Sequence, residues 1–128
     1  MTDDTKAVVE LTREELVARW QRGEPFHLID VLPHEHYTRL HLPGSMNVPL
    51  PVLRDLAPLL FGHTEHLIVY CANTQCTAST TAAKILLQLG FQYVWVYAAG
   101  MQDWYDAGLP VVHRDGVVKD EEKAGAVA

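Results

Sequence analysis

The stretch that decides the fold is residues 66–90, which read HLIVYCANTQCTASTTAAKILLQLG. His66–Tyr70 predicts a buried strand, because an almost continuous apolar run is typical of a sheet that is covered on both faces. Small and polar residues follow, and Thr80–Leu89 then predicts a helix that Gly90 ends. Cys71 is therefore expected where a buried strand passes into a loop that leads to a helix.

Strands and helices alternate on both sides of this stretch. The other predicted strands are 8–11, 27–31, 46–48 and 93–97, with 111–112 as a last edge strand. Four further helices are predicted. One begins at a capping box formed by Thr12 and Glu15, and another covers 33–39. The other two are indicated by apolar residues at helical spacing: Leu53, Leu56, Leu59 and Leu60 in one, and Met101, Trp104 and Tyr105 in the other. Because strands separated by helices form βα units, we predict an α/β fold with a central, mainly parallel five-stranded sheet flanked by helices on both faces.

Length and composition indicate one globular domain. The chain has 128 residues, of which 48% are hydrophobic and 20% charged. We predict a single domain over 1–128, with its core at about 8–112 and a flexible tail at 114–128. The net charge of −6 disfavours nucleic-acid binding, which needs a basic surface. Apolar runs fall short of the about 20 residues that span a bilayer, and no secretory signal is recognisable, so we expect no membrane association and a cytoplasmic location.

The position of Cys71 suits a nucleophilic sulfur. The loop that it opens consists of Ala72, Asn73, Thr74, Gln75, Cys76, Thr77, Ala78 and Ser79. A helix begins after this loop, with Thr77 or Ser79 as its candidate N-cap. Free backbone N–H groups and the helix dipole at such a start bind anions and favour the thiolate over the thiol. The loop amides are therefore expected to form a cradle for an anionic group carried on Cys71.

The role of Cys76 stays open at this stage. It could form a disulfide with Cys71, relay sulfur, or only fill the loop. A structural zinc site needs a second pair of ligands, which would have to come from the histidines. The simplest interpretation of the histidines is that they are solvated or hydrogen-bonded, so we expect no metal and no cofactor. The histidines are His27, His34, His36, His41, His63, His66 and His113.

Three motifs in order resemble the rhodanese-like (sulfurtransferase) domain, single-domain type. The first is Leu28-Ile29-Asp30-Val31, followed by Glu35, Tyr37, His41-Leu42-Pro43-Gly44-Ser45 and Asn47-Val48-Pro49. The second is Val69-Tyr70-Cys71, with Ala82-Ala83, Leu86 and Gly90-Phe91 downstream. The third is Gly100-Met101, Trp104 and Gly108-Leu109-Pro110-Val111. Together they run from about Val8 to Val112.

The resemblance implies a sulfurtransferase that carries a persulfide on Cys71. In that mechanism the Cys71 thiolate takes a sulfane sulfur from thiosulfate or a persulfide donor and passes it to a thiophilic acceptor. The implied partners are a small sulfur-containing anion or a protein persulfide as donor, and a thiol as acceptor. Loop amides would stabilise the anionic persulfide.

The chain departs from the family pattern at several positions. Leu32 replaces the common Arg after Asp-Val, and Leu40 and Ala99 replace glycines. Cys76 occupies the position of the usual loop Arg, and Ser79 matches the following Ser only after a two-residue insertion. No Arg or Lys occurs in 71–83, so the loop lacks a bidentate donor for an oxyanion. A longer loop without Arg suits a larger substrate or a protein persulfide.

Two other classes of function remain open. The pair Cys71 and Cys76 would also serve a thiol–disulfide or oxidant-responsive protein. The chain could instead be a non-catalytic interaction module, because many domains reuse a fold without its chemistry.

Overall fold

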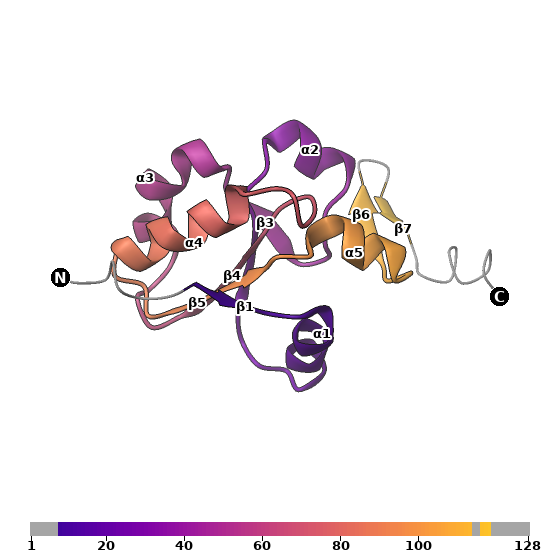
Figure 1. Cartoon of the computed structure of the whole chain (residues 1–128), viewed down its shortest axis with the longest axis horizontal. Helices are drawn as coiled ribbons and strands as arrows, with labels where there is room; N and C mark the ends of the chain where they lie inside the picture. Colours follow the sequence, from indigo (N-terminus) through magenta and orange to yellow (C-terminus); the bar gives the residue numbers. More distant parts are fainter. Residues whose placement is uncertain (1–7, 114–115, 119–128) are drawn as a thin grey trace.

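The computed structural model describes residues 8–113 and 116–118 and has an α/β architecture (Figure 1). Its helices are α1 (Arg13–Gln21), α2 (His34–Arg39), α3 (Leu50–Leu60), α4 (Ala78–Gln88) and α5 (Gly100–Asp106). Its strands are β1 (Val9–Glu10), β2 (His27–Asp30), β3 (Ser45–Asn47), β4 (His66–Tyr70), β5 (Tyr93–Tyr97), β6 (Val111–His113) and β7 (Gly116–Val118).

The first five strands form one sheet in the order β1-β5-β4-β2-β3, and every pairing in it is parallel. The predicted five-stranded sheet with helices on both faces is therefore confirmed. β4 lies at its centre between β2 and β5, so its backbone is hydrogen-bonded on both edges. A side chain that follows β4 is thus placed at the middle of the carboxyl edge of the sheet, where ligands bind in open α/β folds.

Side chains of β4 alternate between two hydrophobic layers. Leu67 and Val69 pack on the face that α3 and α4 cover, whereas Ile68 and Tyr70 pack on the face that α1 and α5 cover. All four are fully buried, which explains why the strand reads as a continuous apolar run rather than an alternating one. Cys71 continues the alternation and joins the layer beneath α3 and α4.

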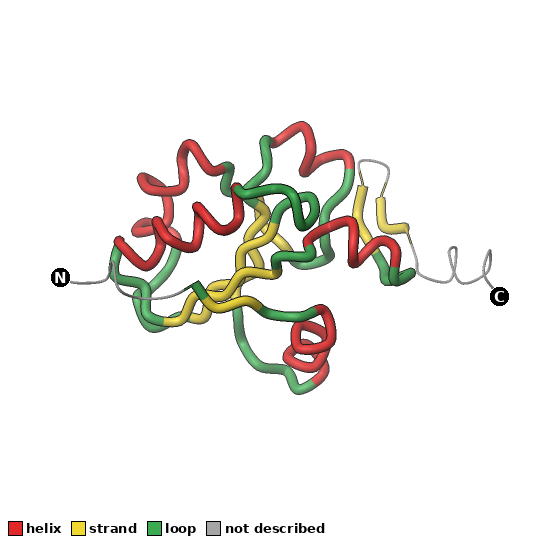
Figure 2. The backbone as a smooth tube through the Cα atoms, viewed as in Figure 1, coloured by secondary structure: helices red, strands yellow, loops and turns green. Residues whose placement is uncertain are grey.

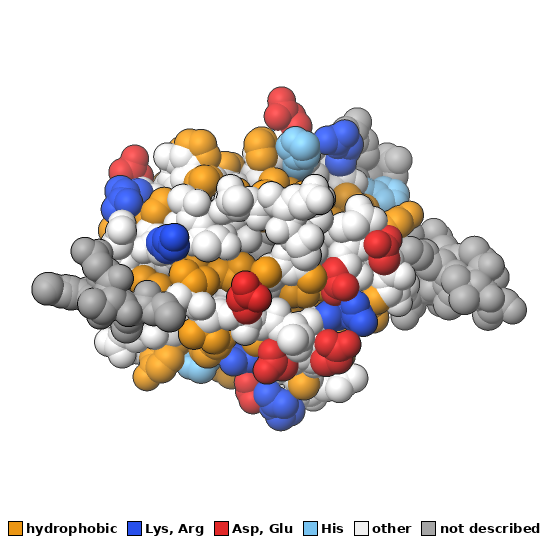
Figure 3. Space-filling view, viewed as in Figure 1, with side chains coloured by type: hydrophobic (Ala, Val, Ile, Leu, Met, Phe, Trp, Pro, Cys, Tyr) orange, Lys and Arg blue, Asp and Glu red, His pale blue; other side chains and the backbone are white. Residues whose placement is uncertain are grey.

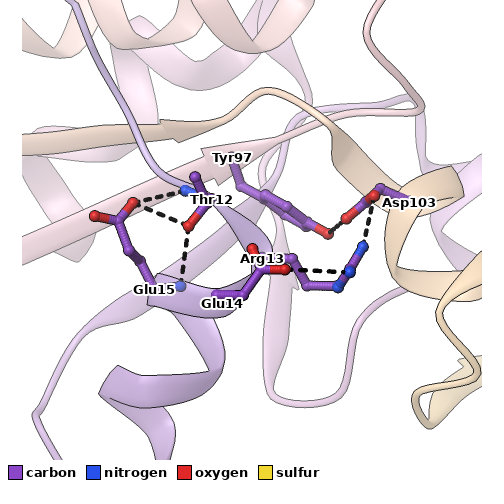
Figure 4. A network of polar contacts seen from close by, with 6 residues as sticks. All are labelled: Thr12, Arg13, Glu14, Glu15, Tyr97 and Asp103. Atoms are coloured by element: carbon purple, nitrogen blue, oxygen red, sulfur yellow. Dashed lines mark hydrogen bonds and ion pairs between the residues drawn. The ribbon is translucent and has the colours of Figure 1, made fainter.

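Helix α1 is fixed at its start by the predicted capping box and by an ion pair to α5 (Figure 4). Arg13 Nη1 donates to Asp103 Oδ1 over 2.7 Å, and Tyr97 Oη donates to Asp103 Oδ2 over 2.6 Å. Burial, helped by the hydrogen bond to Asp103, raises the pKa of Tyr97, so the phenol keeps its proton and remains a donor. Asp103 therefore ties α1, β5 and α5 together on one face of the sheet.

The C-terminal strand differs from the prediction. Residues 111–112 do not extend the main sheet; they belong to β6, which pairs antiparallel with β7 in a separate two-stranded sheet. The N–H of Val112 donates to the carbonyl of His41, and the N–H of His41 donates back to Val112, each over 2.8 Å. This strand is thereby attached to the segment after α2. Gly116–Val118 forms β7, although it lies within the tail predicted at 114–128. Residues 114–115 and 119–128 lie outside the described residues.

The leucine stripe predicted for α3 is only partly a core stripe. Leu53 is fully buried, but Leu56, Leu59 and Leu60 are 38%, 80% and 45% exposed. The helix covers the sheet with Leu53 and Ala57, four residues apart, and Leu50 packs against the same layer. The longest described helices, α3 and α4, have 11 residues, and no described helix combines the length and apolar character that a bilayer crossing requires.

Asp30 at the end of β2 is a buried carboxyl group. Its Oδ1 accepts a hydrogen bond of 2.9 Å from the N–H of Leu32, and its Oδ2 has no hydrogen-bond partner among the described residues. Burial raises the pKa of Asp30 to about 6, more than the N–H of Leu32 and the nearby Tyr70 hydroxyl lower it. The folded protein therefore holds the Asp30 proton to a higher pH than the unfolded chain does.

This difference predicts a pH-dependent stability. The contribution of Asp30 is fully present below the pKa of about 3.8 expected for the unfolded chain and is lost as the pH rises through about 6. Asp30→Asn cannot ionise, so the free energy of unfolding of the variant should rise relative to wild type, by up to about 3 kcal/mol between pH ~4 and ~7. Urea denaturation followed by tryptophan fluorescence across this pH range measures the difference. If the free energies of unfolding of the variant and of wild type changed in parallel with pH, the prediction would be wrong.

Candidate active site

Cys71 follows the last residue of the central strand and is almost entirely buried. Its exposed fraction is 1%, and its side chain packs in the layer beneath α3 and α4. The loop that follows it lies at the carboxyl end of the sheet, between β4 and α4 (Figure 2). The predicted arrangement of strand, loop and helix around Cys71 is thus the one that the structure has.

The sulfur of Cys71 is paired with that of Cys76 in a disulfide, with the two Cα atoms 6.4 Å apart. A turn that begins at Asn73 brings Cys76 back to Cys71: the carbonyl of Asn73 accepts from the N–H of Cys76 over 3.1 Å, and Asn73 Oδ1 accepts from the N–H of Gln75 over 3.0 Å. Of the three roles left open for Cys76, the structure has the pairing. In this form Cys71 is not a nucleophile, so the reduced form is the one that could accept sulfur.

The start of α4 faces the same sulfur. Thr77 occupies the N-cap position, but no side chain caps the helix, in contrast to the prediction that Thr77 or Ser79 would do so. The hydroxyl of Ser79 lies instead 3.3 Å from the Cys71 sulfur. The first N–H groups of α4 therefore lack a side-chain acceptor and provide positive potential beside the sulfur. The amides of Gln75 and Cys76 donate within the Asn73 turn, and the carbonyl oxygen of Cys76 lies 3.5 Å from the Cys71 sulfur, so the expected cradle of loop amides stays a prediction.

A close approach of α5 fixes the backbone at Cys71. The N–H of Met101 donates to the carbonyl of Cys71 over 2.9 Å, and the N–H of Gln102 donates to the carbonyl of Ala72 over 2.8 Å. Gly100 has φ +71°, and a Cβ atom there would lie 2.6 Å from the carbonyl oxygen of Cys71. Only glycine allows both this φ and this contact. The start of α5 therefore fixes the backbone of the residue that carries the sulfur.

A cavity of about 460 Å³ adjoins this backbone. It is lined by Leu32, His36, Arg39, Leu40, Ala72, Met101, Tyr105 and His113, from α2, α5, β6 and the loops between them. Basic and histidine side chains lie over α2 and β6 with an acidic one beside them, whereas most acidic side chains on this face lie over α1 and α5, with basic ones among them (Figure 3). Arg39 Nη2 lies 3.3 Å from His36 Nδ1. The cation absent from the Cys71 loop is thus supplied to its surroundings by α2.

Comparison with known proteins agrees with this architecture. Residues 12–107 match the family model described as Rhodanese-like domain.

The chain belongs to the rhodanese-like domain family.

A relative of this rhodanese-like domain is the HTH-type transcriptional regulator Rv0324 of Mycobacterium tuberculosis, 38% identical over 101 residues, which are 79% of this chain and 43% of the regulator. Another is the adenylyltransferase and sulfurtransferase MOCS3 of Oryza sativa, 32% identical over 92 residues, which are 64% of this chain and 21% of that protein. The chain thus spans less than half the length of these relatives. Among solved structures, the Alr3790 protein from Anabaena sp. superposes with a TM-score of 0.75 at 27% identity, covering 80% of each chain.

The structure brings together some predicted site residues and adds others. The sulfur of Cys71 contacts both the sulfur of Cys76 and the hydroxyl of Ser79, and Ala72 lines the cavity. Sequence reasoning did not find Arg39, because nothing in its local pattern indicates that α2 lies beside the Cys71 loop. Within the described residues, no group of at least three His, Cys, Asp or Glu side chains is arranged to hold a metal ion.

The close approach at Gly100 makes a prediction about stability. Gly23 has nearly the same φ, +72°, but a Cβ atom there would have no neighbour within 4 Å. The free energy of unfolding of Gly23→Ala should therefore fall only by the roughly 1–2 kcal/mol that a left-handed backbone conformation costs an alanine. Gly100→Ala must also displace the Cys71 carbonyl, so its free energy of unfolding should fall by at least about 1 kcal/mol more. Urea denaturation of both variants tests this, and equal losses would show that the contact at Gly100 is not a constraint.

Proposed function

We propose that this rhodanese-like domain is a sulfurtransferase whose nucleophile is Cys71. The observation that carries the proposal is the position of Cys71, at the end of the central strand and beside the uncapped start of α4. Family membership and the sulfurtransferase among the relatives support sulfur transfer as the class of chemistry. Thiolate and persulfide anions both gain from the helix-terminal N–H groups.

The proposed cycle has two transfers. The reduced Cys71 thiolate attacks the outer sulfur of the donor; with thiosulfate, the bond between its two sulfur atoms breaks, a persulfide forms on Cys71 and sulfite leaves with the electron pair. A thiophilic acceptor, such as a thiol or cyanide, then takes the outer sulfur and restores the thiolate. The hydroxyl of Ser79, 3.3 Å from the sulfur, is placed to donate to either anion.

The donor is an anionic sulfur compound, either small or carried on a protein. The cavity beside Ala72 has room for a small anion, and Arg39 gives it positive potential. The same cavity is open to a persulfide group on a partner protein. Because a free Cys71 thiolate requires reducing conditions, a cytoplasmic location is part of the proposal.

Intact mass spectrometry tests the proposed nucleophile. Reduced protein exposed to thiosulfate, or to a low-molecular-weight persulfide, should gain about 32 Da, one sulfur atom. Cys71→Ser should not gain it and should lose sulfur transfer to cyanide by at least about 100-fold, because an oxygen cannot carry the sulfane sulfur. Cys76→Ser should keep both the mass gain and the sulfur transfer to cyanide. No gain in Cys76→Ser with either donor would overturn the proposal.

Arg39 provides a test of the donor site. Arg39→Gln should raise the KM for thiosulfate about 3–10-fold and leave kcat nearly unchanged, because the side chain is exposed and acts on binding rather than on the reacting sulfur. Arg54→Gln removes the same charge from α3, where Arg54 bonds to Gln88, and serves as the matched control. Equal KM values for the two variants would remove Arg39 from the donor site.

A second candidate function is thiol–disulfide exchange, favoured by the Cys71–Cys76 pair itself. A redox-responsive domain would cycle between dithiol and disulfide without taking up sulfur. One relative is named as a transcriptional regulator, which supports a sensing role as the alternative to sulfur transfer. Disulfide formation with oxidants, together with no mass gain from any sulfur donor, would favour this function.

A further inference from the structure

We propose that Cys76 is a resolving thiol that discharges the Cys71 persulfide as hydrosulfide. The proposal rests on the proposed sulfurtransferase function and adds a second product to it. It assigns the domain an activity that converts sulfane sulfur into free sulfide at the expense of thiols, in addition to transfer to an external acceptor.

The geometry points to Cys76 because the folded backbone already allows the two sulfurs to bond. Their Cα atoms are 6.4 Å apart, within the range of about 4.4–6.8 Å that disulfides need, so no rearrangement of β4 or α4 is required. The Asn73 turn holds Cys76 in this position through the N–H of Cys76 itself. At the other end, the α5 amides hold the carbonyl of Cys71. Both sulfurs are therefore carried on anchored backbone.

The same geometry selects which sulfur Cys76 attacks. The inner sulfur of the persulfide is Cys71 Sγ, which is the atom that Cys76 reaches in this structure. The outer sulfur would lie about 2 Å further along the bond from Cys71. Attack on the inner sulfur gives a disulfide, whereas attack on the outer sulfur would move the persulfide to Cys76.

The step balances in atoms and electrons. The Cys76 thiol gives its proton to the outer sulfur of the anionic persulfide, and the resulting thiolate forms a bond to Cys71 Sγ. The bond between the inner and outer sulfurs breaks, and the protonated outer sulfur leaves with the electron pair as HS⁻. The sulfane sulfur is reduced by two electrons, and the two cysteines are oxidised to the disulfide. A dithiol reductant then reduces the disulfide by exchange and restores both thiols. With thiosulfate as donor, each cycle turns one thiosulfate and one dithiol into sulfite, hydrosulfide, one proton and an oxidised dithiol.

The surroundings of the pair suit the departure of an anion. No Arg or Lys lies in 71–83 to hold a persulfide or sulfide tightly, whereas the start of α4 and the Ser79 hydroxyl stabilise sulfur anions without a full charge. Cys71 is only 1% exposed, so an external thiol has poor access to the inner sulfur. Cys76 is the thiol that the fold supplies at that atom.

A single-turnover experiment on the full chain tests the proposal. The protein is reduced, freed of reductant without oxygen, and mixed with one equivalent of thiosulfate or of a low-molecular-weight persulfide, with no acceptor present. Wild type should gain about 32 Da transiently, end about 2 Da below the reduced mass, and release about one equivalent of hydrosulfide per chain. Cys76→Ser and Cys76→Ala should stay at the higher mass and release hydrosulfide at least about tenfold more slowly.

The outcomes separate this proposal from the one on which it rests. If Cys76→Ser never gains the sulfur, the sulfurtransferase proposal fails. If Cys76→Ser gains it, but wild type keeps the persulfide and releases no hydrosulfide, only the resolving role of Cys76 fails. Peptide mapping that finds the added sulfur on Cys76 would show a relay and overturn the resolving step. Reduced wild type kept without donor should retain its mass, which excludes oxidation by residual oxygen.

Discussion

The placement of the candidate nucleophile depends on one close approach between two backbones. The start of α5 donates N–H groups to the carbonyls of Cys71 and Ala72, and Gly100 leaves no side chain between them. The strand fixes the chain up to Tyr70, and α5 fixes the two residues that follow. The backbone that carries the sulfur is thus held by main-chain hydrogen bonds.

That contact in turn depends on the layer on the other face of the sheet. α5 is connected to α1 and β5 through Asp103, which accepts from Arg13 and Tyr97. Trp104 on the same helix is buried in the layer that contains Tyr70 and Tyr97. The face of the sheet opposite the Cys71 side chain therefore positions the helix that holds the Cys71 backbone, which links packing on one face to chemistry at the edge.

The paired cysteines change how the site is understood. A loop with a cation would hold an anionic persulfide in place, whereas this loop places a second thiol beside it and leaves positive charge to α2, across the cavity. In the proposed function, binding of the donor and discharge of the sulfur would be separate tasks of separate elements. Arg39 would serve the first and Cys76 the second.

Residue patterns along the chain are enough to predict the strand at 66–70, the helix after it, the parallel sheet and the position of Cys71 between them. These features were predictable because burial on both faces leaves a continuous apolar run, and because capping and stop signals are local. The tertiary structure alone decided that Cys76 reaches Cys71, that Arg39 lies across the cavity, and that 111–112 joins a separate pair of strands. Such contacts join residues on different elements, so they depend on packing directions that no local pattern of residue types encodes.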